Sequence, residues 1–231
     1  MKDLRYLQHK DWFSNLAFQA FQKYFASRSD FDAFVDSIAA DEEKSRFLKV
    51  ASHYKFLVKD GRFSVPEYEE AKDFDETYRF LAICALIEWA EPRVSYKGFY
   101  TWVRKLAAAF PIQDPQELKT LHQQYRSQFR LMNKMVSFFL RLDVSSKQEL
   151  ESSIKVNGQP IAIEEVARTL YGLRSKFMHS ARLIVELSGM RTFSARHPGR
   201  EITLPLERVE RIFERGVLLR FGYAAPASWP K

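Results

Sequence analysis

The stretch IEEVARTLYGLRSKFMHSARLIVEL, residues 163–187, carries apolar side chains at helical spacing along its length. At about 100° per residue these side chains fall on one stripe of a helix. The stripe contains Val166, Leu170, Leu173, Phe177, Ala181 and Ile184. Glu164 and Glu165 would stand in the first turn, where carboxylates interact favourably with the helix dipole. The pattern predicts a helix from about Ile163 to Leu187 that packs its apolar stripe against a bundle.

Similar apolar spacing predicts helices through most of the chain, at about 11–28, 31–39, 41–58, 74–89, 96–110, 115–142 and 206–219. The chain has only 8 Gly and 9 Pro in 231 residues, which is few for an all-β protein. The one convincing β signal is Asn157-Gly158, the dipeptide typical of a tight hairpin turn. The predicted fold class is therefore all-α, or mostly α, with a small β-hairpin near 154–161.

The chain has no internal repeat and no obvious linker, so its domain organisation is read from small changes in pattern. A break around Asp60 to Asp73 divides an N-terminal helical segment, 1–70, from a helical domain, 71–231. The boundary is soft, and a single continuous domain is the alternative. The aromatic helix near Trp12 is either a docking surface or a part of the core.

Composition restricts the class of protein. Lys and Arg exceed Asp and Glu by 36 to 29, which fits either a phosphate-bearing partner or a protein that is merely basic. The single Cys84 cannot form an internal disulfide, and no Cys/His spacing predicts a metal or cofactor site. The polar start and an apolar run that breaks at Glu88 predict no export signal and no membrane span. We expect a soluble protein of the reducing cytoplasm.

Residues 170–180, Leu-Tyr-Gly-Leu-Arg-Ser-Lys-Phe-Met-His-Ser, resemble the signature of the HEPN superfamily. In that family an Arg, a polar residue directly after it and a His lie on a late helix of an α bundle. The resemblance covers about Phe74 to Phe221. It implies a HEPN-like helical bundle with an Arg-x4-His motif, here Arg174 to His179.

Two other pairs in the chain have nearly the same spacing: Arg46 with His53, and Arg191 with His197. The second pair runs into His-Pro-Gly, which is typical of a loop. The first occurs early in the chain, in surroundings that do not resemble the family. The lead-in Leu-Tyr-Gly-Leu distinguishes the pair Arg174 and His179.

Helical geometry places a polar stripe away from the apolar one, formed by Arg168, Tyr171, Ser175, His179 and Arg182. Arg174 lies between the two stripes, about 140° around the axis from His179. The two motif residues therefore do not face each other on one helix. In the family, two protomers pack so that both motifs line one cleft, which implies a homodimer here.

The resemblance implies a metal-independent endoribonuclease that needs no cofactor. His179 would move the proton of a ribose 2′-hydroxyl or of the leaving oxygen, and Arg174 would hold the scissile phosphate. Ser175 would orient the phosphate or the imidazole. Arg168, Tyr171 and Arg182 would bind the RNA substrate. Ala181 stands where one toxin subgroup has Tyr, so inactivation by nucleotide transfer to that Tyr is not carried over.

The family also implies a toxin–antitoxin or anti-phage defence setting, with a cognate antitoxin or a defence-system subunit as a further partner. Two alternatives remain open. One is a non-catalytic HEPN-like module that binds RNA or nucleotide or serves in assembly; the other is a helical protein-interaction domain. Glu88 is a candidate partner for an Arg of the motif helix, although it equally fits a helix-end carboxylate that faces solvent.

Overall fold

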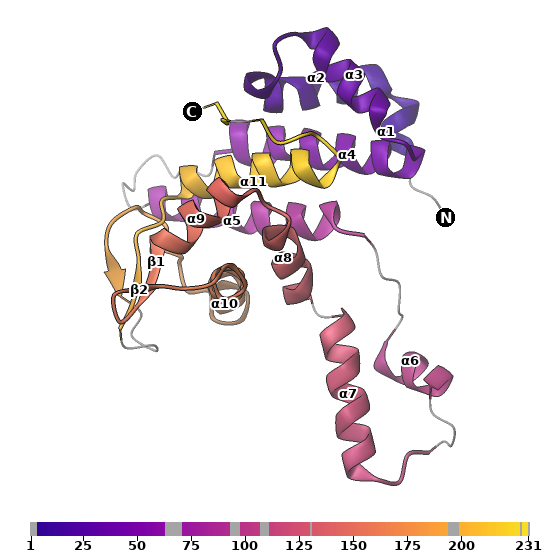
Figure 1. Cartoon of the computed structure of the whole chain (residues 1–231), viewed down its shortest axis with the longest axis vertical. Coiled ribbons are helices and arrows are strands. Elements are labelled where there is room, and N and C mark those ends of the chain that lie inside the picture. Colours follow the sequence, from indigo (N-terminus) through magenta and orange to yellow (C-terminus); the bar gives the residue numbers. More distant parts are fainter. Residues whose placement is uncertain are drawn as a thin grey trace.

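The computed structural model describes residues 4–62, 71–92, 98–106, 111–129, 131–193, 199–226 and 228–230. Within these ranges the chain is mostly helical, which confirms the predicted fold class (Figure 1). The N-terminal elements are α1 (Arg5–Gln8), α2 (Lys10–Phe21), the short turn η1 (Gln22–Tyr24), α3 (Arg28–Ser37), α4 (Asp41–Tyr54) and the π-helical η2 (Lys55–Asp60). The helices that follow are α5 (Ala71–Ala90), α6 (Phe99–Leu106), α7 (Pro115–Phe129), α8 (Leu131–Leu140), α9 (Val144–Ser153), α10 (Ile163–Ser180) and α11 (Leu206–Arg220).

Helix α4 lies in the middle of the body, with α2 on one side and α5 on the other (Figure 1). Its side chains Phe47 and Tyr54 are fully buried. The ring of Tyr54 lies 4.9 Å from that of Phe213 on α11, so the N-terminal helices share one apolar core with the C-terminal helix. Residues 63–70, within the predicted boundary, lie outside the described residues.

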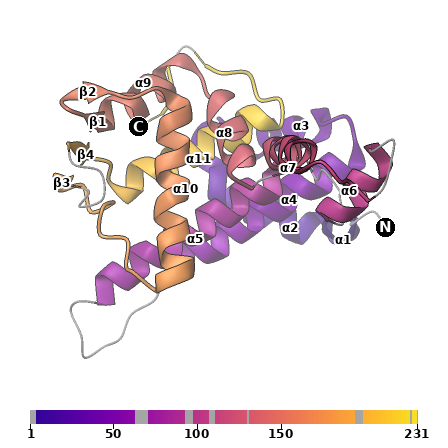
Figure 2. The same ribbon diagram turned by 90° about the horizontal axis from the view of Figure 1, so that it is seen from below.

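Helix α10 packs against α8, α5 and α9 and crosses α5 (Figure 2). Its apolar stripe is buried as predicted through Val166, Leu170 and Leu173. The predicted end at Leu187 is wrong, because the helix stops at Ser180. Ala181 adopts the left-handed conformation with φ 50°.

Two tertiary contacts explain this early end. The backbone N–H of Ile184 donates a hydrogen bond to the hydroxyl of Thr77 on α5, at 3.0 Å. Ile184 and Leu187 are then buried by a turning segment rather than by a continued helix. Burial of two apolar side chains and a satisfied amide offset the cost of a non-glycine residue in the left-handed region.

The predicted hairpin is confirmed. Strands β1 (Ile154–Val156) and β2 (Gln159–Pro160) pair antiparallel around Asn157 and Gly158, whose φ angles of 51° and 78° suit a tight two-residue turn. The sequence did not predict the two strands that extend it, β3 (Thr192–Phe193) and β4 (Arg200–Ile202). The described sheet has the order β2-β1-β4-β3.

Two other helix predictions need correction, and a third is tested only over part of its range. The predicted helix 115–142 is two helices, since α8 packs against α5 and α10 whereas α7 packs against α6; Arg130 lies outside the described residues. The predicted helix 96–110 is described only at 99–106, as α6, which with α7 forms an arm that projects from the body (Figure 1). The predicted helix 11–28 ends before Phe25, because Ser27 caps a new helix by accepting a hydrogen bond from the Asp30 amide.

Helix α9 was not predicted; Asp143 caps its N-terminus. None of the helices in the described part of the chain is long and apolar enough to cross a membrane.

Candidate functional site

Arg174 projects from the middle of α10 toward α5. Its Nη2 lies 3.1 Å from Oε1 of Glu88, and both side chains are largely buried. Its guanidinium also lies over the ring of Tyr171, 5.5 Å from the centroid. The carboxylate of Glu88 therefore pairs with an Arg of the motif helix rather than facing solvent alone.

The carboxylate of Glu88 is partly buried and lies near the cations of Arg174 and Lys134. Burial raises the pKa of Glu88 above its usual value, while the cations of Arg174 and Lys134 act in the opposite direction. Lys134 also donates a hydrogen bond to the backbone carbonyl of Glu88. One turn earlier, burial raises the pKa of the Cys84 thiol, so this buried cysteine stays protonated. The pair Arg174–Glu88 thus joins α10 to α5 at the edge of the core.

His179 occupies the last turn of α10 and is exposed. Among the described residues its imidazole has no hydrogen-bond or ion-pair partner. Ser175 is half-buried one turn before it. His179 stands five residues after Arg174, or about 140° around the axis and about 7.5 Å along it. Within one chain the two motif residues do not converge.

The three predicted substrate-binding residues do not form one continuous stripe. Tyr171 contacts Arg174. Arg168 lies about one turn before Tyr171 on α10, and its Nη1 is 3.7 Å from Glu165. Arg182 is exposed, but it follows the end of α10 and so does not continue the polar stripe as predicted, because the chain turns at Ala181.

The two rival Arg/His pairs have other contacts. Arg46 forms an ion pair with Glu43 on its own helix. His53 is half-buried, burial lowers its pKa, and its Nδ1 contacts the carbonyl of Lys49. Arg191 pairs with Glu201 at 2.7 Å, and His197 lies outside the described residues. Arg46 and His53 therefore contact their own helix, and Arg191 contacts strand β4.

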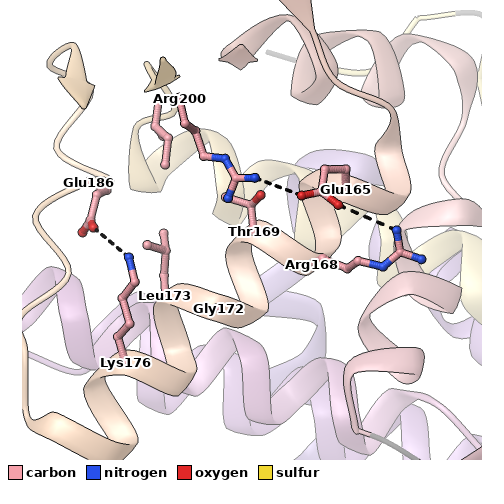
Figure 3. A pocket seen from close by; sticks show the side chains of 9 residues that line it. Glu165, Arg168, Thr169, Gly172, Leu173, Lys176, Glu186 and Arg200 are labelled. Carbon is pink, nitrogen blue, oxygen red and sulfur yellow. Dashed lines mark hydrogen bonds and ion pairs between the residues drawn. The ribbon is translucent and has the colours of Figure 1, made fainter. Parts of the chain in front are cut away.

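A cavity of about 240 Å³ lies beside α10, on a face that contains Arg168 and not Arg174. Figure 3 shows an ion pair at each end of it. At one end Arg200 of β4 reaches Glu165 at 2.9 Å, and at the other Lys176 lies 3.8 Å from Glu186. The lining consists of Glu165, Arg168, Thr169, Gly172, Leu173, Lys176, Glu186, Arg200 and Ile202.

Among the polar groups of this cavity, Arg168 was predicted to bind substrate and Glu165 only to stabilise the helix N-terminus. Thr169, Gly172 and Lys176 are spaced three and four residues apart, so the sequence could have placed them on one face of the helix. No signal connects Glu186 or Arg200 to this face, because a turn and a sheet bring them there.

Within the described ranges, no group of three or more His, Cys, Asp or Glu side chains is arranged to hold a metal ion. The chain was compared with models of known protein families, with curated proteins and with solved structures, and none of the three comparisons found a match.

Proposed function

We propose that this protein is a metal-independent endoribonuclease of the HEPN type, which cleaves RNA where two copies of α10 meet. The observation that carries the proposal is the contrast within the motif. Arg174 is fixed by Glu88 and Tyr171, whereas His179 is exposed and unpaired among the described residues. A fixed guanidinium from one copy of α10 and a free imidazole from another copy suit phosphate binding together with proton transfer.

The reaction follows from these two groups. The imidazole of His179 accepts the proton of a ribose 2′-hydroxyl, and the 2′-oxygen attacks the adjacent phosphorus. The bond from phosphorus to the 5′-oxygen breaks, and that oxygen takes the proton from the imidazolium formed in the first step. Arg174 stabilises the negative charge that develops on the phosphate oxygens. The products are a 2′,3′-cyclic phosphate and a 5′-hydroxyl.

A second copy of the chain supplies what one copy lacks. Arg174 and His179 lie on different flanks of α10, so a partner's motif brings an Arg and a His to the same phosphate. Exposed apolar side chains beside the motif support such packing, since Met178 is 59% exposed and Tyr78 is 37% exposed. The toxin–antitoxin or anti-phage defence setting belongs to the same proposal.

The pairing of Arg174 with Glu88 also favours a second candidate function. A guanidinium that is already paired gives less to a reacting phosphate than a free one, so α10 would serve in a non-catalytic module that binds RNA. The two candidates differ in one respect: only the nuclease makes new RNA ends.

The test incubates a 5′-labelled single-stranded RNA with the wild type, Arg174→Ala and His179→Ala, with EDTA present. We expect the wild type to release fragments with 2′,3′-cyclic phosphate ends. Loss of the imidazole should lower the rate by about 10²–10⁴-fold and loss of the guanidinium by about 10²–10³-fold. Matched controls are His9→Ala and Arg126→Ala, which remove the same side chains from exposed positions elsewhere. Intact RNA at high wild-type concentration, with binding retained, would establish the second candidate instead.

Mixed dimers test the shared cleft. In a heterodimer of Arg174→Ala and His179→Ala, the first chain keeps its His179 and the second keeps its Arg174. A shared cleft can therefore still contain one intact Arg and one intact His. We expect mixing the two inactive variants to restore a measurable part of the cleavage rate. If mixing restores nothing although mass measurement shows the heterodimer, the cleft is not shared between protomers.

A further inference from the structure

The cavity beside α10 contains a polar group that the protein itself does not satisfy. Thr169 is 6% exposed, and among the described residues its hydroxyl has no hydrogen-bond partner. Leaving such a group unpaired in the interior is unfavourable. Since Thr169 lines the cavity, a bound group is in a position to accept its hydrogen bond (Figure 3).

Gly172 lines the same cavity from the middle of α10. A Cβ built on Gly172 meets nothing within 4 Å, so no close packing requires glycine here. Glycine in a helix interior destabilises the helix relative to alanine. What its missing side chain leaves is open space over one turn of the helix, between the two ion pairs.

The charges around this space favour an anion. Arg168, Lys176 and Arg200 line it together with two carboxylates, an excess of one positive charge. The guanidinium of Arg200 uses one nitrogen for Glu165, and its Nε is buried without a partner among the described residues. Unused donors therefore outnumber unused acceptors, and the ligand has to supply acceptors.

The ion pairs that Glu165 forms in this cavity indicate which kind of anion would bind. Glu165 already forms ion pairs with Arg168 and Arg200. A ligand with a single carboxylate would offer these two arginines no more charge than Glu165 does. A phosphomonoester carries about −1.5 to −2 charges at neutral pH and three terminal oxygens, so it binds two guanidinium groups and a hydroxyl together. At about 240 Å³ the space is smaller than the pockets of about 300–1,000 Å³ that hold drug-sized ligands.

We propose that this cavity binds a small phosphomonoester of sugar-phosphate size. Its phosphate lies among Arg168, Arg200 and Thr169, and its organic part lies over Gly172 toward the pair Lys176–Glu186, whose charged groups bind hydroxyls. Leu173 and Ile202 supply apolar contact. Binding here does not depend on RNA cleavage, because neither Arg174 nor His179 lines the cavity.

The test measures binding of ribose 5-phosphate by calorimetry and by the shift in melting temperature, with ribose and inorganic phosphate as the two separated parts. We expect ribose 5-phosphate to bind saturably and more tightly than inorganic phosphate, and ribose not to bind. Absence of saturable binding up to about 10 mM ribose 5-phosphate would overturn the proposal, since that limit corresponds to only about 3 kcal/mol of binding energy. Equal binding of inorganic phosphate would overturn the role of the organic part.

Three variants locate the binding. Thr169→Val keeps the shape and removes the unpaired hydroxyl, so the free protein should be as stable as the wild type while its affinity for ribose 5-phosphate falls about tenfold or more. Gly172→Leu should fill the space and abolish binding, whereas Gly172→Ala should retain it. Melting temperatures without ligand show that each variant folds. Unchanged affinity in both Thr169→Val and Gly172→Leu would place the ligand elsewhere and refute the assignment.

Discussion

Arg174 and His179 belong to one short motif but lie in different environments. Arg174 is largely buried and paired with Glu88, whereas His179 is exposed at the end of its helix. Their angular separation follows from helical geometry and was available from the sequence. The sequence left two alternatives for Glu88, an ion pair with an Arg of the motif helix or exposure to solvent. Local sequence does not show whether a side chain on one helix faces solvent or a second helix.

At the same scale, Asp143 joins two segments through one carboxylate. It caps α9 by accepting the backbone N–H of Ser146 at 3.0 Å, and it accepts the indole N–H of Trp229 at 2.9 Å. Burial acts to raise the pKa of Asp143, but hydrogen bonds from Ser145, Ser146 and Trp229 lower it from 3.8 to about 2. The ionised form is therefore favoured in the folded protein.

Asp143→Ala should lower the free energy of unfolding by about 1–2 kcal/mol, because the cap and the contact with Trp229 are both lost. The folded-state pKa is the lower one, so this stabilisation is present above pH 4 and is lost as the pH falls toward 2. Urea unfolding at several pH values measures it. Asp143→Asn, which keeps a cap oxygen, should retain most of the stability without this acid dependence. An equal acid dependence in Asp143→Asn would contradict the assignment.

At the scale of the element, two glycines occupy helix interiors for different reasons. Gly172 of α10 faces open space, whereas Gly216 of α11 lies against α8. A Cβ at Gly216 would overlap the ring of Phe138 and approach Leu142 Cδ2 to 3.1 Å. Both positions look alike in the sequence, as single glycines in helical patterns. Only the neighbouring helix decides which of them is required.

Alanine at these two positions should have opposite effects on stability. Gly172→Ala should raise the free energy of unfolding by about 0.5–1 kcal/mol, since the helix gains propensity without a clash. Gly216→Ala should lower it by about 1–3 kcal/mol, because α8 and α11 have to move apart. Chemical denaturation of both variants measures the difference. Equal effects of the same sign would contradict this description of the α8–α11 contact.

At the scale of the whole molecule, Glu214 joins the N-terminal helices to α11. Its side chain is fully buried and accepts hydrogen bonds from the hydroxyls of Tyr24 and Tyr54 at 2.7 and 2.8 Å. Lys23 and Lys59 form ion pairs with it at 2.8 and 2.7 Å. Burial acts to raise the pKa of Glu214, but the charges of these lysines outweigh burial and hold it below the usual value.

Glu214→Gln should lower the free energy of unfolding by about 3 kcal/mol, because two lysines lose a buried counter-charge. The pKa of Glu214 is lowered in the folded state, so its contribution is present at neutral pH and is lost as the pH falls through that lowered value. The difference between variant and wild type in urea unfolding should therefore shrink in acid.

The control is Asp36→Asn, which removes a carboxylate from an exposed pair with Lys10. This change should have little effect, because water screens the pair. If Glu214→Gln were as mild as Asp36→Asn, α11 would not depend on this carboxylate for its attachment to the N-terminal helices.

The sequence by itself determined the local features of this protein. It specified the mostly helical class, the buried stripe of α10 and the Asn157-Gly158 turn, because helix periodicity and turn conformation depend on near neighbours. Tertiary structure decided where α10 ends, which carboxylate holds Arg174, and that Glu186 and Arg200 close a cavity over Gly172. These features depend on groups from separate segments meeting in space, for which local periodicity carries no information.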